Sequence, residues 1–406
     1  MNTKKMETNL LIGTIITNMA DSILYILTVW YFNENYSSPI MLSVVFSIIS
    51  IIDAFSFLLG PIIDRTTAKI NLFCMSIIQT VLLCFLFIFT FCLNMSNIAR
   101  GVLLVVILSL TYIASAVIYP SGQKIIPMIV EKERLVKVNS LFSTSEKVLD
   151  IFFNAISTVI ITFFHDSFTI MIILLLFLLS IKFYYYVSRR VSGEGKSQEE
   201  TYSFTEYITD LKAGIIEIKK HKEILKIFVP IIAVNFFYGI AMVALPIVAK
   251  KYISAEAYGY GSLLVCASLG GVLGTFIVGK TKNVMNKHSA FTAFCLLAAG
   301  IAWMLMTLGI KDAYILSFIF IFISNASISM MNVIFVVLIQ TSIEINLLGR
   351  VSTLTESLAS VMIPAGNIAG GVLILFISPI SAEMLYGFAL IICAIPYLVK
   401  EKTLIK

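Results

Sequence analysis

The residue with the most unexpected chemistry is Asp21, because it lies in the middle of a long apolar run that extends from Asn9 to Phe32. A charge at the centre of a bilayer costs on the order of 2.5–3.5 kcal/mol on insertion scales. Polar side chains recur around Asp21 at three- and four-residue spacing, which places them on one face of a helix. The stripe consists of Thr14, Thr17, Asn18, Asp21, Ser22, Tyr25 and Thr28.

A stripe of this kind is expected to face a water-filled cavity rather than lipid. Asp21 can avoid the cost of a buried charge if it is protonated or paired, and a group that releases and regains a proton could couple proton flow to another process. The alternative is a static hydrogen bond from neutral Asp21 to a neighbouring helix. The sequence favours proton exchange.

A second group of ionisable side chains lies in the stretch NSLFSTSEKVLDIFFNAIST. Glu146 and Asp150 are four residues apart, and Lys147 and Asp150 are three apart, so a helix brings all three within reach of one another. Lys147 can neutralise one carboxylate and leave the other to titrate. Asp150 is the better candidate, because Glu146 lies only about 10 Å from the predicted inner end of the helix. Asn154 extends the same face.

Two further carboxylates complete the set of candidates for proton coupling. Asp53 lies two helical turns before Gly60 and is interpreted either as a gate residue or as a partner of Lys147, and the sequence favours neither. Glu356 lies one turn into a late apolar run, where the helix dipole alone stabilises a carboxylate. A structural role is therefore favoured for Glu356.

The apolar runs of the C-terminal half carry amides where those of the N-terminal half carry charges. Amide, aromatic and thioether side chains are the candidates for contact with a substrate, although helix packing is the commoner role of each. The candidates are Tyr25, Asn18, Asn154, Asn235, Tyr238, Asn325, Asn332 and Met331. This distribution suggests a division in which the first half handles protons and substrate binds between the halves.

The elements that position these side chains are predicted to be membrane-spanning helices. Of the 406 residues, 59% are hydrophobic and 13% are charged, and the mean hydropathy is +0.97; a soluble globule would carry about a quarter charged residues. Apolar runs of about twenty residues, enough to span roughly 30 Å of hydrocarbon, recur along the chain. The predicted spans are 9–32, 38–63, 70–93, 100–119, 139–164, 167–187, 227–250, 258–280, 288–310, 313–339, 351–377 and 383–399.

We therefore predict an all-α integral membrane protein with twelve transmembrane helices in two six-helix halves, a plan common among secondary transporters. The halves are residues 1–187 and 227–406. Residues 188–226 form a cytoplasmic linker, in which FTEYITDLKAGIIEIKKHKEILK is expected to be a basic amphipathic helix along the inner leaflet.

The placement of positive charge predicts the orientation. If both termini are cytoplasmic, 23 of the 29 Lys and Arg residues lie in inner connections and four in outer ones. The outer connections hold Arg100, Lys250, Lys251 and Lys311. We expect a multi-pass protein of the cell membrane, and we read the net charge of +6 as a result of this topology rather than as a sign of nucleic-acid binding.

Sequence signatures of enzymes are lacking. His165, His221 and His288 are scattered, with no HExxH pattern. The stretch GTFIVGKT (274–281) has the GxxxxGK[ST] spacing, but it ends the predicted apolar span 258–280 instead of joining a strand to a helix, so it is not predicted to be a phosphate-binding loop. The six cysteines all lie in apolar runs and form no CxxC spacing. We therefore predict a protein that is not an enzyme, with no catalytic residues, no cofactor and no metal site, and one that does not draw its energy from ATP.

Between the second and third predicted spans stands GPIIDRTTAK, which resembles the cytoplasmic signature of the major facilitator superfamily. Gly60, Asp64, Arg65 and Lys69 fit that pattern, whereas Thr67 occupies a position usually held by a second glycine. In such a gate motif the glycine permits close helix approach, and the aspartate caps a helix or pairs with a basic partner.

Several stretches also resemble the macrolide-efflux branch of that superfamily, among them YFNENYSSPIMLS, AYGYGSLLVCASLGGVLGTFIVGK and LGRVSTLTESLASVMIPAGNIAGG. The resemblance implies proton-driven export of amphipathic small molecules by alternating access, which we expect from a monomer. One departure weakens the inference of antiport: residues 139–164 lack the Gly- and Pro-rich motif found in many twelve-span antiporters. The alternatives are a lipid, peptide or siderophore exporter or a uniporter on the same fold, or a ligand-binding membrane sensor or immunity protein.

Overall fold

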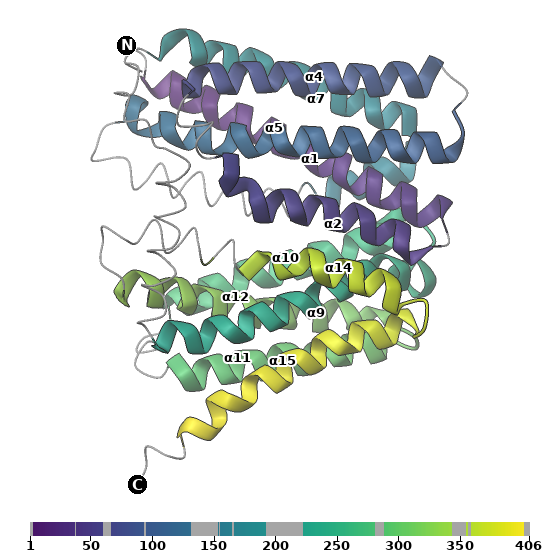
Figure 1. The fold of residues 1–406 in the computed structure, drawn as a ribbon, viewed down its shortest axis with the longest axis vertical. Coiled ribbons are helices and arrows are strands. Elements are labelled where there is room, and N and C mark those ends of the chain that lie inside the picture. The colour runs from purple at the N-terminus through teal and green to yellow at the C-terminus, as the bar shows by residue number, and fades with distance from the viewer. Residues whose placement is uncertain are drawn as a thin grey trace. The chain divides into compact units, whose positions relative to one another are not determined.

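The fold is helical almost throughout the part of the chain that the computed structural model describes (Figure 1). No strand occurs in this part, and nine of its helices are long and apolar enough to cross a membrane. The predicted all-α membrane fold is thereby confirmed. The described residues are 3–36, 38–59, 66–92, 95–130, 153, 155–164, 166–191, 222–280, 288–342, 355 and 359–401.

The chain divides into two compact units, of which unit 1 comprises Met1–Asn35 and Phe55–Tyr202. Helix α1 packs against α5 and α7, and α4 packs against the same two helices, so the four form a bundle. The described elements of unit 1 are α1 (Thr3–Asn35), the 3-10 turn η1 (Ser56–Leu59), α4 (Ala68–Cys92), α5 (Asn97–Ile129) and α7 (Asp166–Arg190).

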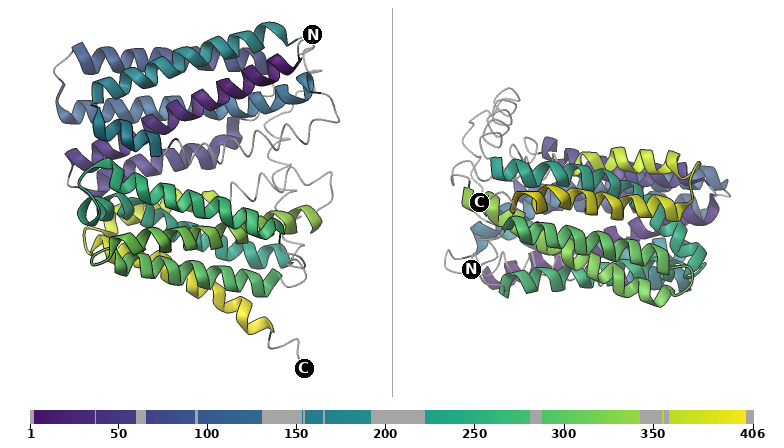
Figure 2. Two further views of the ribbon diagram at one scale, coloured as in Figure 1. Left: turned by 180° about the vertical axis from the view of Figure 1, so that it is seen from behind. Right: turned by 90° about the horizontal axis from the view of Figure 1, so that it is seen from below.

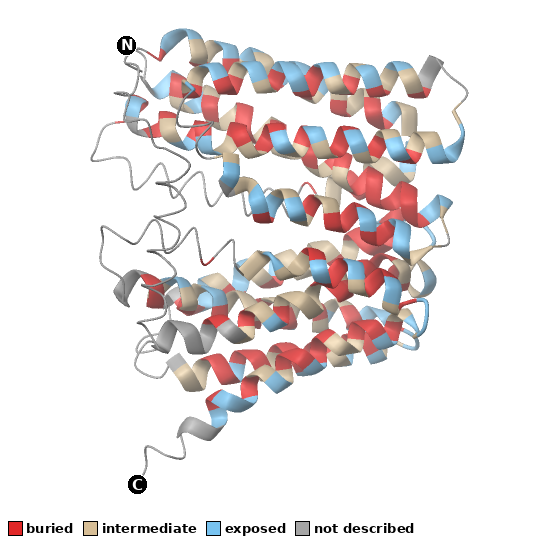
Figure 3. Cartoon of the chain, in the orientation of Figure 1, coloured by how far each residue is buried: buried red, intermediate tan, exposed pale blue. Residues whose placement is uncertain are grey.

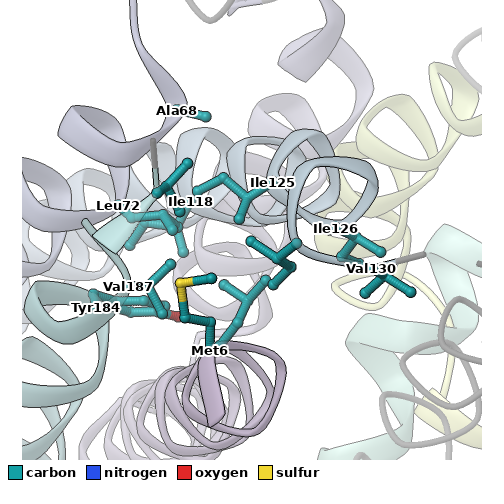
Figure 4. Close-up of a cluster of buried hydrophobic side chains, with 12 residues drawn as sticks. Met6, Ala68, Leu72, Ile118, Ile125, Ile126, Val130, Tyr184 and Val187 are labelled. Atoms are coloured by element: carbon teal, nitrogen blue, oxygen red, sulfur yellow. The ribbon is translucent and has the colours of Figure 1, made fainter. Parts of the chain in front are cut away.

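Buried side chains from all four helices pack together at one end of this bundle (Figure 4). Met6 of α1, Leu72 of α4, Ile125 of α5 and Tyr184 of α7 are each at most 1% exposed. Because lipid tails are as apolar as these side chains, close van der Waals packing rather than transfer from water holds the helices together. The cluster fixes the relative positions of the helices that carry the polar groups described below.

Unit 2 comprises Tyr36–Ala54 and Ser203–Lys406. Figure 2 shows the helices within each unit lying alongside one another. In unit 2, α12 packs against α10 and α11, and α15 packs against α11 and α9. The elements are most of α2 (Pro39–Phe55), and α9 (Lys222–Tyr252), α10 (Ala257–Lys280), α11 (His288–Gly309), α12 (Tyr314–Ser342), α14 (Met362–Leu373) and α15 (Pro379–Glu401).

Helix α2 groups with unit 2 although it follows α1 in the chain. Its Ser50 hydroxyl accepts a hydrogen bond of 3.0 Å from the side-chain amide of Asn367 on α14. The predicted boundary between two halves at residues 188–226 lies largely outside the described residues, and it stays a prediction.

Several helices begin or end away from the predicted limits. Helix α1 is longer than 9–32, and α2 ends at Phe55 rather than at residue 63. Helix α15 begins at Pro379, four residues before the predicted start of the last span. Proline is favoured at the first position of a helix, because the missing N–H has no intrahelical partner there. As a consequence Glu383 lies inside a helix and not at its edge.

Helices α10 and α12 approach each other through backbone atoms. A Cβ atom at Gly270 would collide with the carbonyl oxygen of Phe322, and one at Gly274 would collide with that of Ala326. Small residues four apart allow membrane helices to pack at this closeness. The Gly-rich sequence of α10 therefore serves helix packing.

The exposed side chains of the long helices are strongly apolar. Ile88 of α4 is 54% exposed, Phe276 of α10 is 59% exposed and Ile392 of α15 is 61% exposed. Figure 3 shows exposed and buried residues alternating along these helices. A water-soluble protein rarely exposes apolar side chains on this scale, so these surfaces are suited to contact lipid.

Candidate functional site: a buried carboxyl group with hydroxyl partners

Asp21 lies near the middle of α1, about 27 Å along the helix axis from Thr3 and about 21 Å from Asn35 at 1.5 Å per residue. Only 7% of its surface is exposed. Its Oδ2 atom accepts hydrogen bonds from the Ser115 hydroxyl at 2.6 Å and from the Tyr119 hydroxyl at 3.2 Å. Ser115 and Tyr119 are four residues apart, so both reach Asp21 from one face of α5.

A glutamine on a third helix supports these contacts. Gln79 of α4 is fully buried, and its Nε2 donates to the Ser115 hydroxyl oxygen at 2.8 Å and to the main-chain oxygen of Thr111 at 3.3 Å. The hydrogen bonds therefore run from Gln79 through Ser115 to Asp21 and join three helices of unit 1. We call Asp21, Gln79, Ser115 and Tyr119 the Asp21 site.

The charge state of Asp21 determines what this site can do. Its Oδ1 atom is buried and makes no hydrogen bond to any residue that the structure describes. Among the described residues, an ionised Asp21 would thus have two hydroxyl donors and no cationic partner, whereas a buried carboxylate ordinarily needs a charged partner. The neutral acid carries its proton and removes the uncompensated charge. The arrangement is therefore suited to holding a proton.

The rest of the polar stripe on α1 contacts neighbouring helices and its own backbone. Thr17 hydrogen-bonds to the Tyr184 hydroxyl of α7 at 3.1 Å, and Ser22 donates to Asn18 at 3.3 Å. Tyr25 is half-buried. Asp21 itself is joined to a neighbouring helix, but it accepts these hydrogen bonds, whereas the static alternative has neutral Asp21 donating one. Proton exchange requires in addition that the proton leaves in one state of the protein, so both roles stay predictions.

Most of the other predicted proton-coupling and gate residues lie outside the residues that the structure describes. Asp53 is exposed near the end of α2, and Lys69 is the second residue of α4. The candidates that lie outside the described residues are Glu146, Lys147, Asp150, Asn154, Glu356, Gly60, Asp64 and Arg65.

Two of the substrate candidates in unit 2 donate hydrogen bonds to main-chain oxygens. The Asn235 amide donates to the main-chain oxygen of Ala359 at 2.8 Å, and that of Asn325 donates to Ile321 within α12 at 3.0 Å. Met331 is 4% exposed, whereas the neighbouring Asn332 is exposed. Their roles in binding stay predictions.

Unit 1 has one described hollow that none of these candidates lines. It is formed where α4 ends and where α5 and α7 begin. None of the predicted substrate-contact residues lines it. Its lining consists of Leu27, Thr90, Arg100, Leu104, Asp166, Ser167 and Ile170.

The sequence analysis missed a second buried carboxyl group, that of Glu383 on α15, which is fully buried. The indole Nε1 of Trp303 on α11 donates to Oε2 of Glu383 at 3.1 Å and to its main-chain oxygen at 3.2 Å. Oε1 is buried, with no hydrogen-bond partner in the described part of the chain. The expectation that the C-terminal spans carry amides instead of charges is therefore wrong. The signal was present as Glu383 and Tyr386, three residues apart in PISAEMLYGF.

The sequence matches the family model described as Major Facilitator Superfamily over residues 10–367. A relative from Bacillus subtilis, the uncharacterized MFS-type transporter YvqJ, is 25% identical over 259 residues. The aligned region covers 62% of this chain and 59% of that relative, which is less than two thirds of the relative's length.

Solved transporter structures share the fold over nearly the whole chain. The nucleoside transporter NupG matches with a TM-score of 0.71 at 12% identity, covering 98% of this chain and 99% of its own. An inward-facing bacterial homologue of the human lysosomal transporter Spinster matches with a TM-score of 0.66 at 11% identity, over 98% and 95%. A bacterial metal transporter matches with a TM-score of 0.60 at 15% identity, over 96% and 98%. At such identities the likeness concerns the fold alone.

Proposed function

Because the chain belongs to the Major Facilitator Superfamily, we propose that it is a proton-coupled secondary transporter that exports a small amphipathic molecule by alternating access. The observation that carries the proposal is the Asp21 site, in which a buried carboxyl group at mid-helix has hydroxyl partners and one oxygen without a hydrogen bond. The direction and the substrate class rest on the resemblance to macrolide-efflux proteins.

The hydrogen bonds define how Asp21 would take up and release a proton. Both hydroxyl donors address Oδ2, which leaves Oδ1 as the atom that carries the proton. Ser115 and Tyr119 stabilise the anion after the proton leaves, because a hydroxyl donates to a carboxylate more strongly than to a neutral acid. Proton entry is favourable at an inside-negative potential, which supplies about 2.3 kcal/mol per charge per 100 mV.

The remaining candidates complete the proposal. Asp150, Glu146 and Lys147 are further coupling candidates, and the segment from Gly60 to Lys69 would form the cytoplasmic gate. Because carboxylates predominate among the ionisable candidates, we expect lipophilic cations among the substrates. We place the protein in the cell membrane as a monomer, with both termini in the cytoplasm.

The experiment uses inverted membrane vesicles containing the full chain and a fluorescent pH indicator. Ethidium, tetraphenylphosphonium and erythromycin are added in turn as chemically distinct probes. For a transported probe we expect dissipation of the proton gradient, loss of that response in Asp21→Asn, and an unchanged response in the matched variant Asp312→Asn. Asp312 is suitable as a control because it is exposed in the turn after α11.

Two results would contradict the proposal. A transported probe that still dissipates the gradient in Asp21→Asn would remove Asp21 from the coupling reaction. A probe that binds to the purified protein but is neither accumulated nor expelled by vesicles would instead favour a ligand-binding sensor.

A further inference from the structure

Glu383 lies in an aromatic enclosure within unit 2. It is the fifth residue of α15, about 6 Å along the axis from Pro379. Trp303 of α11 holds its carboxyl group, and the ring of Tyr386 meets that indole edge-on with centroids 4.8 Å apart. The ring centroid of Tyr238 of α9 lies 5.5 Å from that of Tyr386. We call these four residues the Glu383 cluster.

The position of the carboxyl group is set by a close crossing of α11 and α15. A Cβ atom at Gly387 would lie 2.6 Å from the Met304 side chain, and one at Gly300 would lie 2.7 Å from the Gly387 oxygen. Gly300 is one turn before Trp303, and Gly387 is one turn after Glu383. The indole therefore reaches the carboxyl group because glycines bring the two helix backbones together.

The Glu383 cluster itself provides no compensation for a negative charge. In the described part of the chain, the titratable side chains that face Glu383 are Tyr238 from α9 and Tyr386 from α15, and neither carries a positive charge. Trp303, from α11, supplies one N–H. An isolated buried carboxylate is so costly that such a group takes a proton instead.

We propose that Glu383 is a proton-binding site in unit 2, separate from Asp21, and that its proton resides on Oε1. Oε1 is the carboxyl oxygen that lacks a hydrogen bond, whereas Oε2 already accepts from the indole. With the proton in place the residue is neutral, and the contact between α11 and α15 closes around it.

The proton fits this site better than larger cations do. A metal ion needs several oxygen ligands, and the described residues contain no group of three His, Cys, Asp or Glu side chains that could hold one. An organic cation could use the aromatic faces, but Trp303 is 3% exposed and Tyr386 is 2% exposed. The closed aromatic packing excludes a ligand of that size.

The proposal links the charge of Glu383 to helix packing. Loss of the proton creates a charge that needs water or a cation, and water can reach it only if α11 and α15 separate at Trp303. Protonation therefore favours the closed contact, and ionisation favours an open one. In the predicted topology this end of α15 faces outward, so that the proton is taken from the outer side.

The chain offers a direct probe of this site, because Trp30 and Trp303 are its two tryptophans. In a Trp30→Phe background the fluorescence of the purified full chain reports on Trp303 alone. We expect its emission to change sigmoidally with pH in lipid nanodiscs without any substrate. The transition should disappear in Glu383→Gln, which keeps an oxygen acceptor for the indole but cannot ionise. The matched control Asp312→Asn should leave the transition unchanged.

Variants of the two tyrosines show which side chain causes the transition, and a second variant of Glu383 covers the case in which Glu383→Gln does not fold. Tyr238→Phe and Tyr386→Phe should retain it, whereas a transition lost with either tyrosine would overturn the assignment to Glu383. If Glu383→Gln does not fold, as judged by gel filtration, Glu383→Asp serves instead and should shift the pH midpoint. An unchanged midpoint, or no transition in the Trp30→Phe protein, would contradict the proposal.

The outcome is independent of transport. Gradient dissipation in vesicles tests Asp21 and the proposed function, while the fluorescence of Trp303 tests proton binding at Glu383 without a substrate. A titrating Glu383 in a protein that does not couple to protons leaves this inference standing, and a proton-coupled protein whose Trp303 does not respond to pH refutes it.

Discussion

Two buried carboxyl groups, one in each unit, are held in different ways. Asp21 accepts from hydroxyls, which can both donate and accept, and one of them in turn accepts from Gln79. Glu383 accepts from an indole N–H, which can only donate. A hydroxyl can reverse its hydrogen bond as a proton moves, whereas an indole cannot. The hydroxyls of the Asp21 site are thus suited to relay a proton, whereas Glu383 can bind and release one but cannot relay it through Trp303.

The largest effect on stability is expected for Asp21→Leu. The substitution removes the acceptor of the buried Ser115 hydroxyl and of the partly buried Tyr119 hydroxyl, and a buried donor without a partner costs about 1–3 kcal/mol. We expect the free energy of unfolding to fall by an amount in this range or somewhat more, measured by reversible unfolding with SDS in mixed micelles. An unchanged free energy of unfolding would mean that Ser115 and Tyr119 find other acceptors. Asp21 would then contribute as little to stability as is expected of Glu383.

An intermediate effect is expected from the two hydroxyl donors. Ser115→Ala should destabilise the protein more than Tyr119→Phe, because the Ser115 bond is shorter, 2.6 Å against 3.2 Å, and because Gln79 also loses an acceptor. Hydrogen bonds between membrane helices contribute about 0.6 kcal/mol on average and up to about 1.7 kcal/mol. The same unfolding assay measures both variants. The reverse order would show that Tyr119 is the principal donor.

The smallest effect is expected for Glu383→Met, within about 0.5 kcal/mol of the unsubstituted protein or slightly stabilising. A buried carboxyl group is removed, and an apolar residue of similar volume often replaces such a group without loss. Trp303 keeps the main-chain oxygen of residue 383 as an acceptor, at 3.2 Å. A loss as large as that of Asp21→Leu would make Glu383 a structural anchor and remove the contrast between the two sites.

The same contrast explains what the sequence could predict. Asp21 was identifiable because polar residues at helical spacing surround it within one apolar run. Glu383 is the fifth residue of its helix, whereas the apolar run in the sequence begins at this charged residue, which puts it at a predicted boundary. The signal that α15 begins earlier was Pro379, a favoured first residue of a helix.

The partners of Asp21 could not have been predicted. Periodicity shows which face of α1 is polar, but it does not show which helix that face meets. Ser115 is 94 residues from Asp21 in sequence, and serine is common in membrane helices at positions that only serve packing. The overall fold was predictable because hydrophobic run length is dictated by bilayer thickness, whereas side-chain contacts depend on how the bundle closes.

The crossing of α10 and α12 limits how unit 2 can rearrange. The carbonyl oxygens of Phe322 and Ala326 lie where a Cβ atom at Gly270 or Gly274 would be. Sliding one helix along the other would drive a carbonyl oxygen into a neighbouring side chain, and packed interiors resist such overlap. The two helices are therefore expected to move as one rigid body, so that a transport cycle that moves one of them also moves the other.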